Sequence, residues 1–531
     1  MKAFVGTVRL VRLVLRRDRI RLPAWIVSLV GLVGFSATQV KSLYGTPATI
    51  SGYVSTASGN PALVMFSGPG YGFDRPTVGA ILVNETSLWM AVGCALMSVF
   101  LVVRHTRAEE ENERADLLRS AVVGRHAPLA AAVVVVVAAD VLVAGASAVV
   151  IIAGGFPVAG SIALAASFGL VGICFAAVAA IAAQIGNTAR GALGLGAAAI
   201  AATFVLRGIG DVSVPALSWL TPFGWGIGIR AYAAERWWTL AGLLVASLTL
   251  VATAAAVSDR RDLGSGLVPQ HGGRGRAAPW ITHPLGLALR LQRASIIAWC
   301  VGVFTTGLMY GWVGRDVEAM LADNPQLADY LAQLSGASVG DAYLATAIGI
   351  MAMVTGGYAL SSALRTRSEE AAGFAESMLA TPTSRVWWAG SHVVVTVLGA
   401  IAVTACSALG TGVGYAIGVD DGTQVLRLVA AGMATLPAVL VLVGIAVALF
   451  GWLPRSTTLA WSALALVVVV GLFGTVLRLP HWVRMISPFE HGARLPAQAF
   501  EVAPAAVLTG LAITLVAFGL GGFRRRDLAS A

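Results

Sequence analysis

Residues 141–189 read VLVAGASAVVIIAGGFPVAGSIALAASFGLVGICFAAVAAIAAQIGNTA, and no charged side chain occurs anywhere in this stretch. A hydrocarbon core about 30 Å thick is crossed by roughly 20 apolar residues in a helix, so the stretch is long enough to cross twice. Gly154, Gly155 and Pro157 interrupt it about a third of the way along, where glycine and proline favour a tight turn. The stretch therefore predicts two transmembrane helices joined by a short loop.

The whole chain has the same character. Of its 531 residues, 57% are hydrophobic and only 12% are charged, and the mean hydropathy is +0.81. This composition is typical of an all-α polytopic membrane protein and not of a soluble globular domain. Apolar runs between charges predict twelve transmembrane helices. They are residues 22–40, 86–103, 128–153, 158–184, 191–206, 238–257, 295–314, 342–364, 387–417, 428–451, 457–477 and 502–522.

The basic residues predict how the chain is oriented. With a cytoplasmic N-terminus, 26 of the 36 Lys and Arg residues fall on the cytoplasmic side, as expected of a protein in the plasma membrane. Both termini are then cytoplasmic. The net charge of +10 is mostly this bias, since the basic residues flank spans and form no single patch for a nucleic acid.

The N-terminal segment carries part of this positive charge. Arg9, Arg12, Arg16 and Arg19 recur at helical spacing with apolar residues between them. We expect an amphipathic helix in the inner membrane interface, with its arginines on anionic membrane lipids. The alternative is a basic flank of the first span without a helix of its own.

Two charged segments indicate that the chain is an internal duplication. RAEEENERADLLRSAVVGR at 107–125 and RSEEAAGFAESMLATPTSR at 367–385 align without a gap. Three further landmarks recur in the same order: LRRDRIRLPAW at 15–25 and LRLQRASIIAW at 289–299, TPFGW at 221–225 and SPFEH at 487–491, and RRDL at 260–263 and 525–528.

Because six spans return the chain to the same side, the duplication predicts two parallel six-helix repeats. We assign residues 1–258 to the first half and residues 284–531 to the second. Residues 259–283, rich in Gly and Pro, are the predicted cytoplasmic linker.

The second charged segment has a helical apolar stripe. Ala371, Phe374, Ala375, Met378 and Leu379 recur at helical spacing, and Pro382 is expected to stop the helix. We expect Phe374, Met378 and Leu379 to be exposed and to fit a groove on another protein. An ordinary interhelix loop, kept from the duplication, is the alternative.

In these segments the acidic residues, the short helix and the following ATPTSR resemble the loop after the second span in the membrane subunits of type-2 ABC exporters. The two fused six-span halves look like the large exporters of polyketide antibiotics and other lipophilic drugs. The first segment departs from the pattern, with Val122 in place of Pro382. The predicted ATPase-coupling residues are Glu109, Glu110, Asp116, Leu117, Leu118 and Arg125, and Glu369, Glu370, Phe374, Glu376, Met378, Leu379, Pro382 and Arg385.

The resemblance implies that each segment is a coupling helix seated in a separate ABC ATPase subunit, present in two copies. The only lysines, Lys2 and Lys41, do not follow glycine, so the chain has no phosphate-binding loop of its own. We therefore predict a transport subunit and not an enzyme, with no catalytic site, metal or cofactor in this chain. ATP and Mg²⁺ are expected on the partner, and the substrate is expected to be a lipophilic small molecule.

Asp140 is the charged residue that stands out inside a predicted span. A carboxylate at mid-membrane costs on the order of 2.5–3.5 kcal/mol on insertion scales, so we expect Asp140 to face the bundle interior. Its counterpart in the second half is Ala400. A role in the transport path or in proton coupling and a structural hydrogen-bonding role are both open.

Four other classes of membrane protein compare with this pattern as follows. A proton-coupled secondary multidrug transporter also has six plus six spans, but its inner loop after the second span is usually short and basic. An ABC importer subunit would need Gly where Glu376 stands in the EEAAG context. A non-transporting scaffold remains an alternative, whereas a membrane-embedded enzyme would gather titratable residues at one depth.

Overall fold

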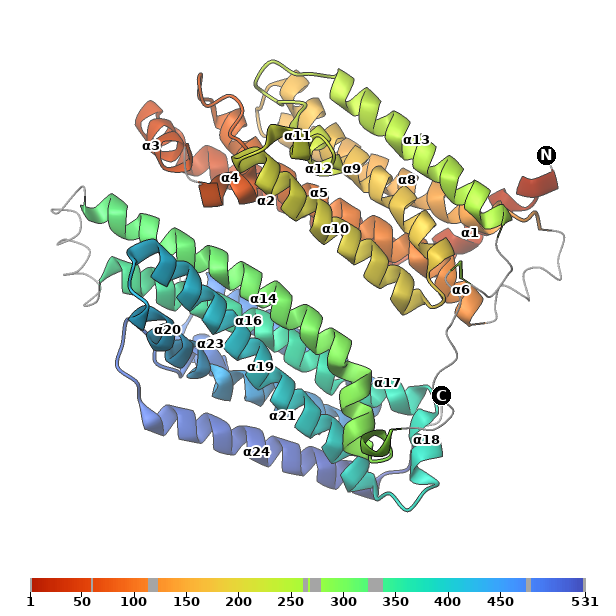
Figure 1. Ribbon diagram of the computed structural model, residues 1–531, viewed down its shortest axis with the longest axis vertical. Helices are drawn as coiled ribbons and strands as arrows, with labels where there is room; N and C mark the ends of the chain where they lie inside the picture. The colour runs from red at the N-terminus through yellow and green to blue at the C-terminus, as the bar shows by residue number, and fades with distance from the viewer. Residues whose placement is uncertain are drawn as a thin grey trace. The chain divides into compact units, whose positions relative to one another are not determined.

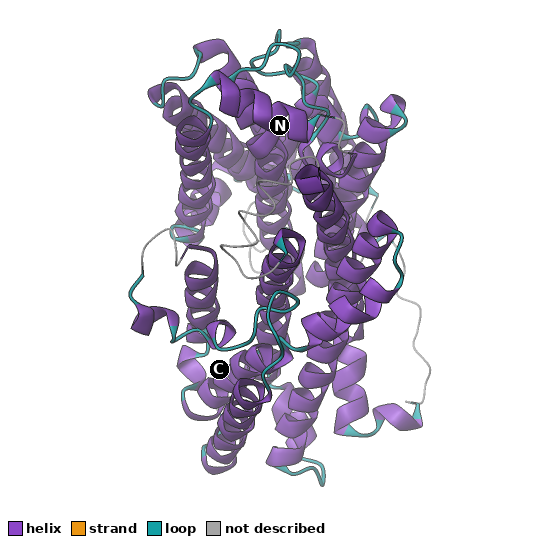
Figure 2. Cartoon of the chain, turned by 90° about the vertical axis from the view of Figure 1, so that its left-hand side faces the viewer, coloured by secondary structure: helices purple, strands orange, loops and turns teal. Residues whose placement is uncertain are grey.

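The computed structural model describes residues 2–58, 61–112, 123–260, 266–267, 278–322, 338–473 and 479–528. These residues form helices joined by loops, and no strand occurs among them (Figure 2). The chain divides into two compact units, Met1–Gly273 and Arg274–Ala531 (Figure 1). The point of division lies within residues 259–283.

Unit 1 begins with a short amphipathic helix, as predicted. Leu10 and Val14 are the buried residues of this helix, α1, whereas its arginines are exposed. The helices of unit 1 are α1 (Thr7–Arg17), α2 (Arg21–Leu43), α3 (Pro47–Ala57), α4 (Pro61–Ser67), α5 (Val78–His105), α6 (Arg107–Glu111), α8 (Ala127–Ala153), α9 (Val158–Ile185), α10 (Ala189–Val212), α11 (Pro215–Ser218), α12 (Pro222–Ile227) and α13 (Trp238–Asp259), preceded by the 3-10 helix η1 (Lys2–Phe4).

Helix α9, from the uncharged stretch 141–189, lies in the core of unit 1. Helix α9 packs against α5, α8, α10 and α13, and most of its residues are buried (Figure 1). The predicted turn before α9 is confirmed, since α8 ends at Ala153 and Gly155 adopts φ +83°. Only glycine takes that left-handed conformation at little cost, so the chain reverses there.

The fifth span is longer than the sequence predicts. We expected residues 191–206, ending before Arg207, but α10 continues to Val212. Arg207 is fully buried, and its guanidinium lies 2.8 Å from the Asp211 carboxylate one turn later. The two charges neutralise each other, so the helix can continue through them.

Unit 2 repeats this order with longer first and third spans. Its helices are α14 (Pro284–Ala322), α16 (Val339–Ala363), α17 (Arg365–Ala371), α18 (Phe374–Leu379), α19 (Arg385–Val419), α20 (Thr423–Met433), α21 (Leu436–Trp452), α22 (Leu459–Phe473), α23 (His481–Arg484) and α24 (Val502–Arg525), with short 3-10 helices at Pro279–Ile281, Pro454–Ser456 and Pro488–Glu490.

Glycines hold two helices of unit 2 in direct backbone contact. Gly307 of α14 faces Ser407 and Thr411 of α19, and a Cβ added there would overlap the backbone of α19. Gly410 and Gly414 of α19 likewise lie against the backbone of α14, which a Cβ at either position would overlap. Small residues permit this close approach, which is the usual way that helices pack in a membrane.

Eleven helical segments of the described part are long and apolar enough to cross a membrane, with α20 and α21 together, Thr423–Trp452, counted as one of them. The remaining predicted span, 457–477, coincides with the shorter apolar helix α22, and its residues 474–477 lie outside the described residues. The span predicted at 428–451 is two helices, α20 and α21, because Pro437 has no N–H to continue the ladder. The all-α polytopic membrane fold is confirmed.

Candidate functional site

The second charged segment is built from two short helices and not from the single helix that we expected. Helix α17 follows α16 directly, and α18 begins at Phe374. Gly373 separates them with φ +77°, a left-handed conformation that ends a regular helix. The chain then turns back through Pro382 into α19, whose first turn is capped by the Ser384 hydroxyl.

The apolar stripe on α18 divides between the inside and the outside of the unit. Ala375 is fully buried in an apolar cluster with Trp388 and Phe523, and Met378 and Leu379 are half-buried against this cluster. Ala389 and Phe450 complete the cluster, and Leu520 and Leu528 also pack against it. Our expectation that Met378 and Leu379 would be exposed is therefore wrong.

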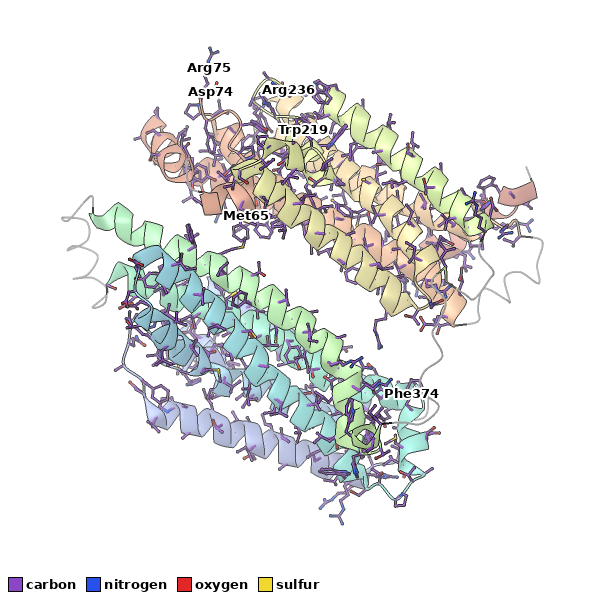
Figure 3. The ribbon with its side chains drawn as sticks, viewed as in Figure 1. Met65, Asp74, Arg75, Trp219, Arg236 and Phe374 are labelled. Atoms are coloured by element: carbon purple, nitrogen blue, oxygen red, sulfur yellow. The ribbon has the colours of Figure 1, made fainter. Side chains whose placement is uncertain are left out.

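Phe374 is the apolar side chain of α18 that projects from the unit, with 62% of its surface exposed (Figure 3). Glu376 and Pro382, also predicted as coupling residues, are exposed on the same segment. The segment therefore presents one large aromatic side chain with a carboxylate close by in sequence.

The acidic residues before α18 are ion-paired within unit 2. The Glu369 carboxylate lies 3.0 Å from Arg365, and the Glu370 carboxylate lies 3.1 Å from Arg367. Arg526 donates to the two carboxylate oxygens of Glu370 through its two terminal guanidinium nitrogens, at 2.6 and 2.9 Å. These acids are therefore neutralised within unit 2 and do not form a cluster of free carboxylates.

The Arg526 side chain is held from several directions. Its guanidinium lies over the rings of Phe450 and Phe523, 5.1 and 5.0 Å from their centroids. It also donates to the Phe450 carbonyl at 3.3 Å. Arg385, at the end of the segment, donates in turn to the Arg526 carbonyl oxygen at 2.5 Å. Both ends of the segment thus meet at one residue just after α24.

The first charged segment begins with a short helix, α6. The Glu109 carboxylate lies 2.7 Å from Arg17 of α1, and the Glu110 carboxylate lies 2.7 Å from Arg107. Residues 113–122, which include the predicted coupling residues Asp116, Leu117 and Leu118, lie outside the described residues. Their roles therefore stay predictions.

Arg125 ends the first segment as Arg385 ends the second. Its guanidinium donates to the carbonyl oxygens of Ser258 and Asp259, at 2.8 and 2.9 Å, where α13 ends. A cation at a helix C-terminus satisfies carbonyls that have no helical partner and interacts favourably with the helix dipole. Both halves therefore fasten the end of the charged segment to the end of their last span.

Sequence reasoning missed two residues that hold the segments. Asp18 is fully buried and binds Arg104 at 3.1 Å as well as His105, which join α1 to the end of α5. A single acid among seven basic residues in 1–22 was the available signal. The only sequence signal for Arg526 was its place in the repeated RRDL, and this repeat does not indicate which residue Arg526 binds.

Asp140 faces the interior of unit 1, as predicted. Its carboxylate accepts a hydrogen bond from the Ser98 hydroxyl at 2.7 Å, and the residue is fully buried. Gly172 of α9 leaves room for the carboxylate, since a Cβ there would overlap it. The Oδ1 atom has no hydrogen-bond partner within the described residues.

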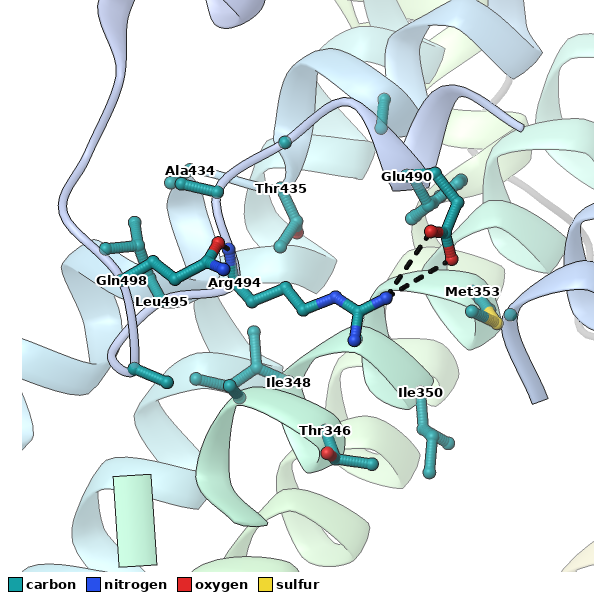
Figure 4. A pocket seen from close by; sticks show the side chains of 18 of the residues that line it. Thr346, Ile348, Ile350, Met353, Ala434, Thr435, Glu490, Arg494, Leu495 and Gln498 are labelled. Carbon is teal, nitrogen blue, oxygen red and sulfur yellow. Dashed lines mark hydrogen bonds and ion pairs between the residues drawn. The ribbon is translucent and has the colours of Figure 1, made fainter. Parts of the chain in front are cut away.

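A cavity of about 370 Å³ lies in unit 2 at the end where α16 and α24 begin. Ile348, Met353 and Leu508 contribute to its apolar walls. Arg494 extends across it towards Glu490, with its guanidinium 3.4 Å from the carboxylate (Figure 4). The volume falls in the range of pockets that accept drug-sized molecules. Among the described residues, no three His, Cys, Asp or Glu side chains are grouped as they would be for a metal.

Comparison with known proteins identifies the family. Residues 281–524 match the family described as the multidrug efflux system permease Rv1217c, C-terminal domain. The chain is also 34% identical over 528 residues to the multidrug efflux system permease protein Rv1217c of Mycobacterium tuberculosis (strain ATCC 25618 / H37Rv), with 99% of this chain and 96% of the relative covered. With an all-helical membrane fold in both halves and similarity along nearly its full length, the chain belongs to the family of multidrug efflux system permeases.

Proposed function

We propose that this chain is the permease subunit of an ATP-driven ABC exporter that moves lipophilic, drug-like compounds out of the cell. The segments 107–125 and 367–385 each dock one copy of a separate ABC ATPase subunit, which holds ATP and Mg²⁺. The chain lies in the plasma membrane with both termini and both segments on the cytoplasmic side, where its basic residues concentrate.

The observation that carries this proposal is the exposed Phe374 on a segment that is otherwise tied down. Glu370 has only 2% of its side chain exposed and is paired with two arginines, so the base of the segment is anchored. Phe374 then projects as a rigidly presented apolar anchor. Large aromatic side chains in a partner's pocket are the residues that most often dominate binding energy at interfaces.

The proposed mechanism begins when ATP binding moves the ATPase subunits. Force on α18 passes to α16 through α17 and to α19 through Pro382 and Ser384, because these elements are consecutive in the chain. The two halves then alternate between inward and outward access. Lipophilic cargo follows an apolar path and meets the cavity at the outer end of unit 2 before release.

Measuring efflux after ATP hydrolysis or the proton gradient has been removed distinguishes this proposal from a proton-coupled transporter. The chain is expressed in a drug-sensitive host together with a co-purifying protein that carries a phosphate-binding loop, and efflux of a lipophilic fluorescent dye is followed. We expect efflux to stop when the phosphate-binding lysine of that protein is replaced by Ala, and to continue when a protonophore collapses the proton gradient while ATP is maintained. Efflux that needs the gradient and not the lysine would overturn the proposal.

A non-transporting scaffold is separated by the same measurement. It would bind the ATPase without any efflux of dye in cells that contain both proteins. Reconstitution of both proteins into vesicles, with ATP supplied on one side only, gives the direction of transport.

A further inference from the structure

We infer that Arg526 is a positioning residue that makes α24, the last span of unit 2, part of the machinery moved by the coupling segment. This inference rests on the proposed function, because it assigns a route for the force delivered by the ATPase. Sequence order alone connects α18 only to α16 and α19. The contacts of Arg526 add α24, which ends at Arg525.

The first support is that both flanks of α18 converge on Arg526. Glu370, four residues before Phe374, binds the Arg526 side chain through two charge-assisted hydrogen bonds. Arg385, at the start of α19, binds the main-chain carbonyl of the same residue. A displacement of α18 that moves α17 and the start of α19 must therefore carry Arg526 with it or break these three bonds.

The second support is that the ion pair between Arg526 and Glu370 is buried and bidentate. Only 15% of the Arg526 side chain and 2% of the Glu370 side chain are exposed. A bidentate pair between guanidinium and carboxylate fixes orientation as well as distance. The rings of Phe450 and Phe523 hold the guanidinium on its other faces, and Phe523 belongs to α24 itself.

The third support is that unit 1 has an attachment at the corresponding place. Arg125 binds the last carbonyls of α13, and His126 lies 3.1 Å from the Asp259 carboxylate at the same point. The residue that matches Arg526 in the repeated RRDL is residue 261, which lies outside the described residues. The end of the charged segment is nevertheless fastened to the last span in both halves.

The test compares Arg526→Ala with Arg525→Ala in the full-length chain purified with its ATPase. Arg525 carries the same charge one residue earlier and is exposed, so it controls for loss of a cation. We expect Arg526→Ala to weaken ATPase binding by no more than about threefold, because the Phe374 side chain is still present and only its support is loosened. We also expect it to lose about tenfold in drug-stimulated ATP hydrolysis and in dye efflux. Arg525→Ala should keep both activities.

Hydrogen exchange on the permease alone gives a readout that does not depend on the ATPase. The amides of residues 372–380 should exchange faster in Arg526→Ala than in the wild type or in Arg525→Ala, because the segment has lost an anchor. If Arg526→Ala does not fold, Arg526→Lys keeps the cation without the two-pronged geometry. That variant should show the same faster exchange and a partial loss of coupling.

Three results would overturn the inference. They are unchanged exchange and unchanged efflux in the Arg526 variants, an equal loss in Arg525→Ala, and a loss of ATPase binding that accounts for all of the lost efflux. A chain that transports without any ATPase would instead disprove the proposed function. The exchange measurement would then still show whether Arg526 anchors the segment.

Discussion

Replacement of Phe374 is the most direct perturbation of the proposed ATPase contact. In the permease alone, 62% of this side chain is in water, so its removal should cost the fold little. Complete burial of a Phe side chain is worth about 1.5–3 kcal/mol, and the part still exposed accounts for roughly 1–2 kcal/mol of that. This amount becomes available only when a partner covers the ring.

Phe374→Ala should therefore weaken binding of the ATPase subunit about 5- to 30-fold, since 1.4 kcal/mol corresponds to a tenfold change in Kd. Phe374→Glu should weaken it further, because a carboxylate would have to be desolvated in an apolar groove. The assay immobilises the detergent-solubilised permease and titrates the ATPase subunit without ATP. Drug-stimulated ATP hydrolysis by the same complexes should fall in parallel at limiting ATPase concentration.

Leu426→Ala is the matched control for this experiment. Leu426 is 76% exposed and lies on α20, beyond the far end of α19 from α18. The control should bind the ATPase like the wild type, and thermal unfolding should show that all variants are folded. An unchanged Kd for folded Phe374→Glu, within about twofold, would refute the reasoning.

Three further substitutions test other parts of the molecule. Leu118→Glu should weaken ATPase binding or uncouple hydrolysis from efflux, but less than Phe374→Glu does, because the first segment has the smaller apolar patch; a larger effect in the same titration would contradict this. Asp140→Asn keeps an oxygen that can accept from Ser98, so a structural role predicts dye efflux within about twofold of wild type, whereas a proton-coupling role predicts its loss. Gly414→Leu should lower the free energy of unfolding by about 1–3 kcal/mol or more, because its Cβ would overlap the backbone of α14. The control Gly349→Leu, with open space around the site, should leave the melting temperature nearly unchanged, and equal shifts would show that close packing is not the cause.

Much of the fold could be predicted because transfer into a membrane is a local property of a run of residues. The turn at Gly154 and Gly155 and the start of α9 at Val158 follow from the sequence in this way. The prediction of the fifth span stopped at Arg207 because single-residue costs treat a charge as alone. Arg207 is paired with Asp211 and buried beside α4, and both features arise only when the helices pack.

The sequence predicted which segment forms the candidate site, but not which of its side chains face the unit and which are exposed. The helical period of 367–385 placed Phe374, Met378 and Leu379 on one stripe, but it could not say which part of the stripe faces the unit. The apolar cluster that includes Trp388 and Phe523 decides this, because Met378 and Leu379 pack against it whereas Phe374 stays exposed. A break at Gly373 also turns α18 away from α17, which periodicity alone does not detect.

By itself, the sequence determined an all-α polytopic membrane protein and predicted two six-span halves, each with a charged segment after its second span, because hydropathy and repetition are carried by neighbouring residues. Only the tertiary structure decided that Glu370 is an internal anchor and not a free acid. Its partner Arg526 is 156 residues away, and the two come together because α16, which leads into α17, and α24 both pack against α21. An ion pair needs charges within a few ångströms, and that proximity is a property of the packed helices alone.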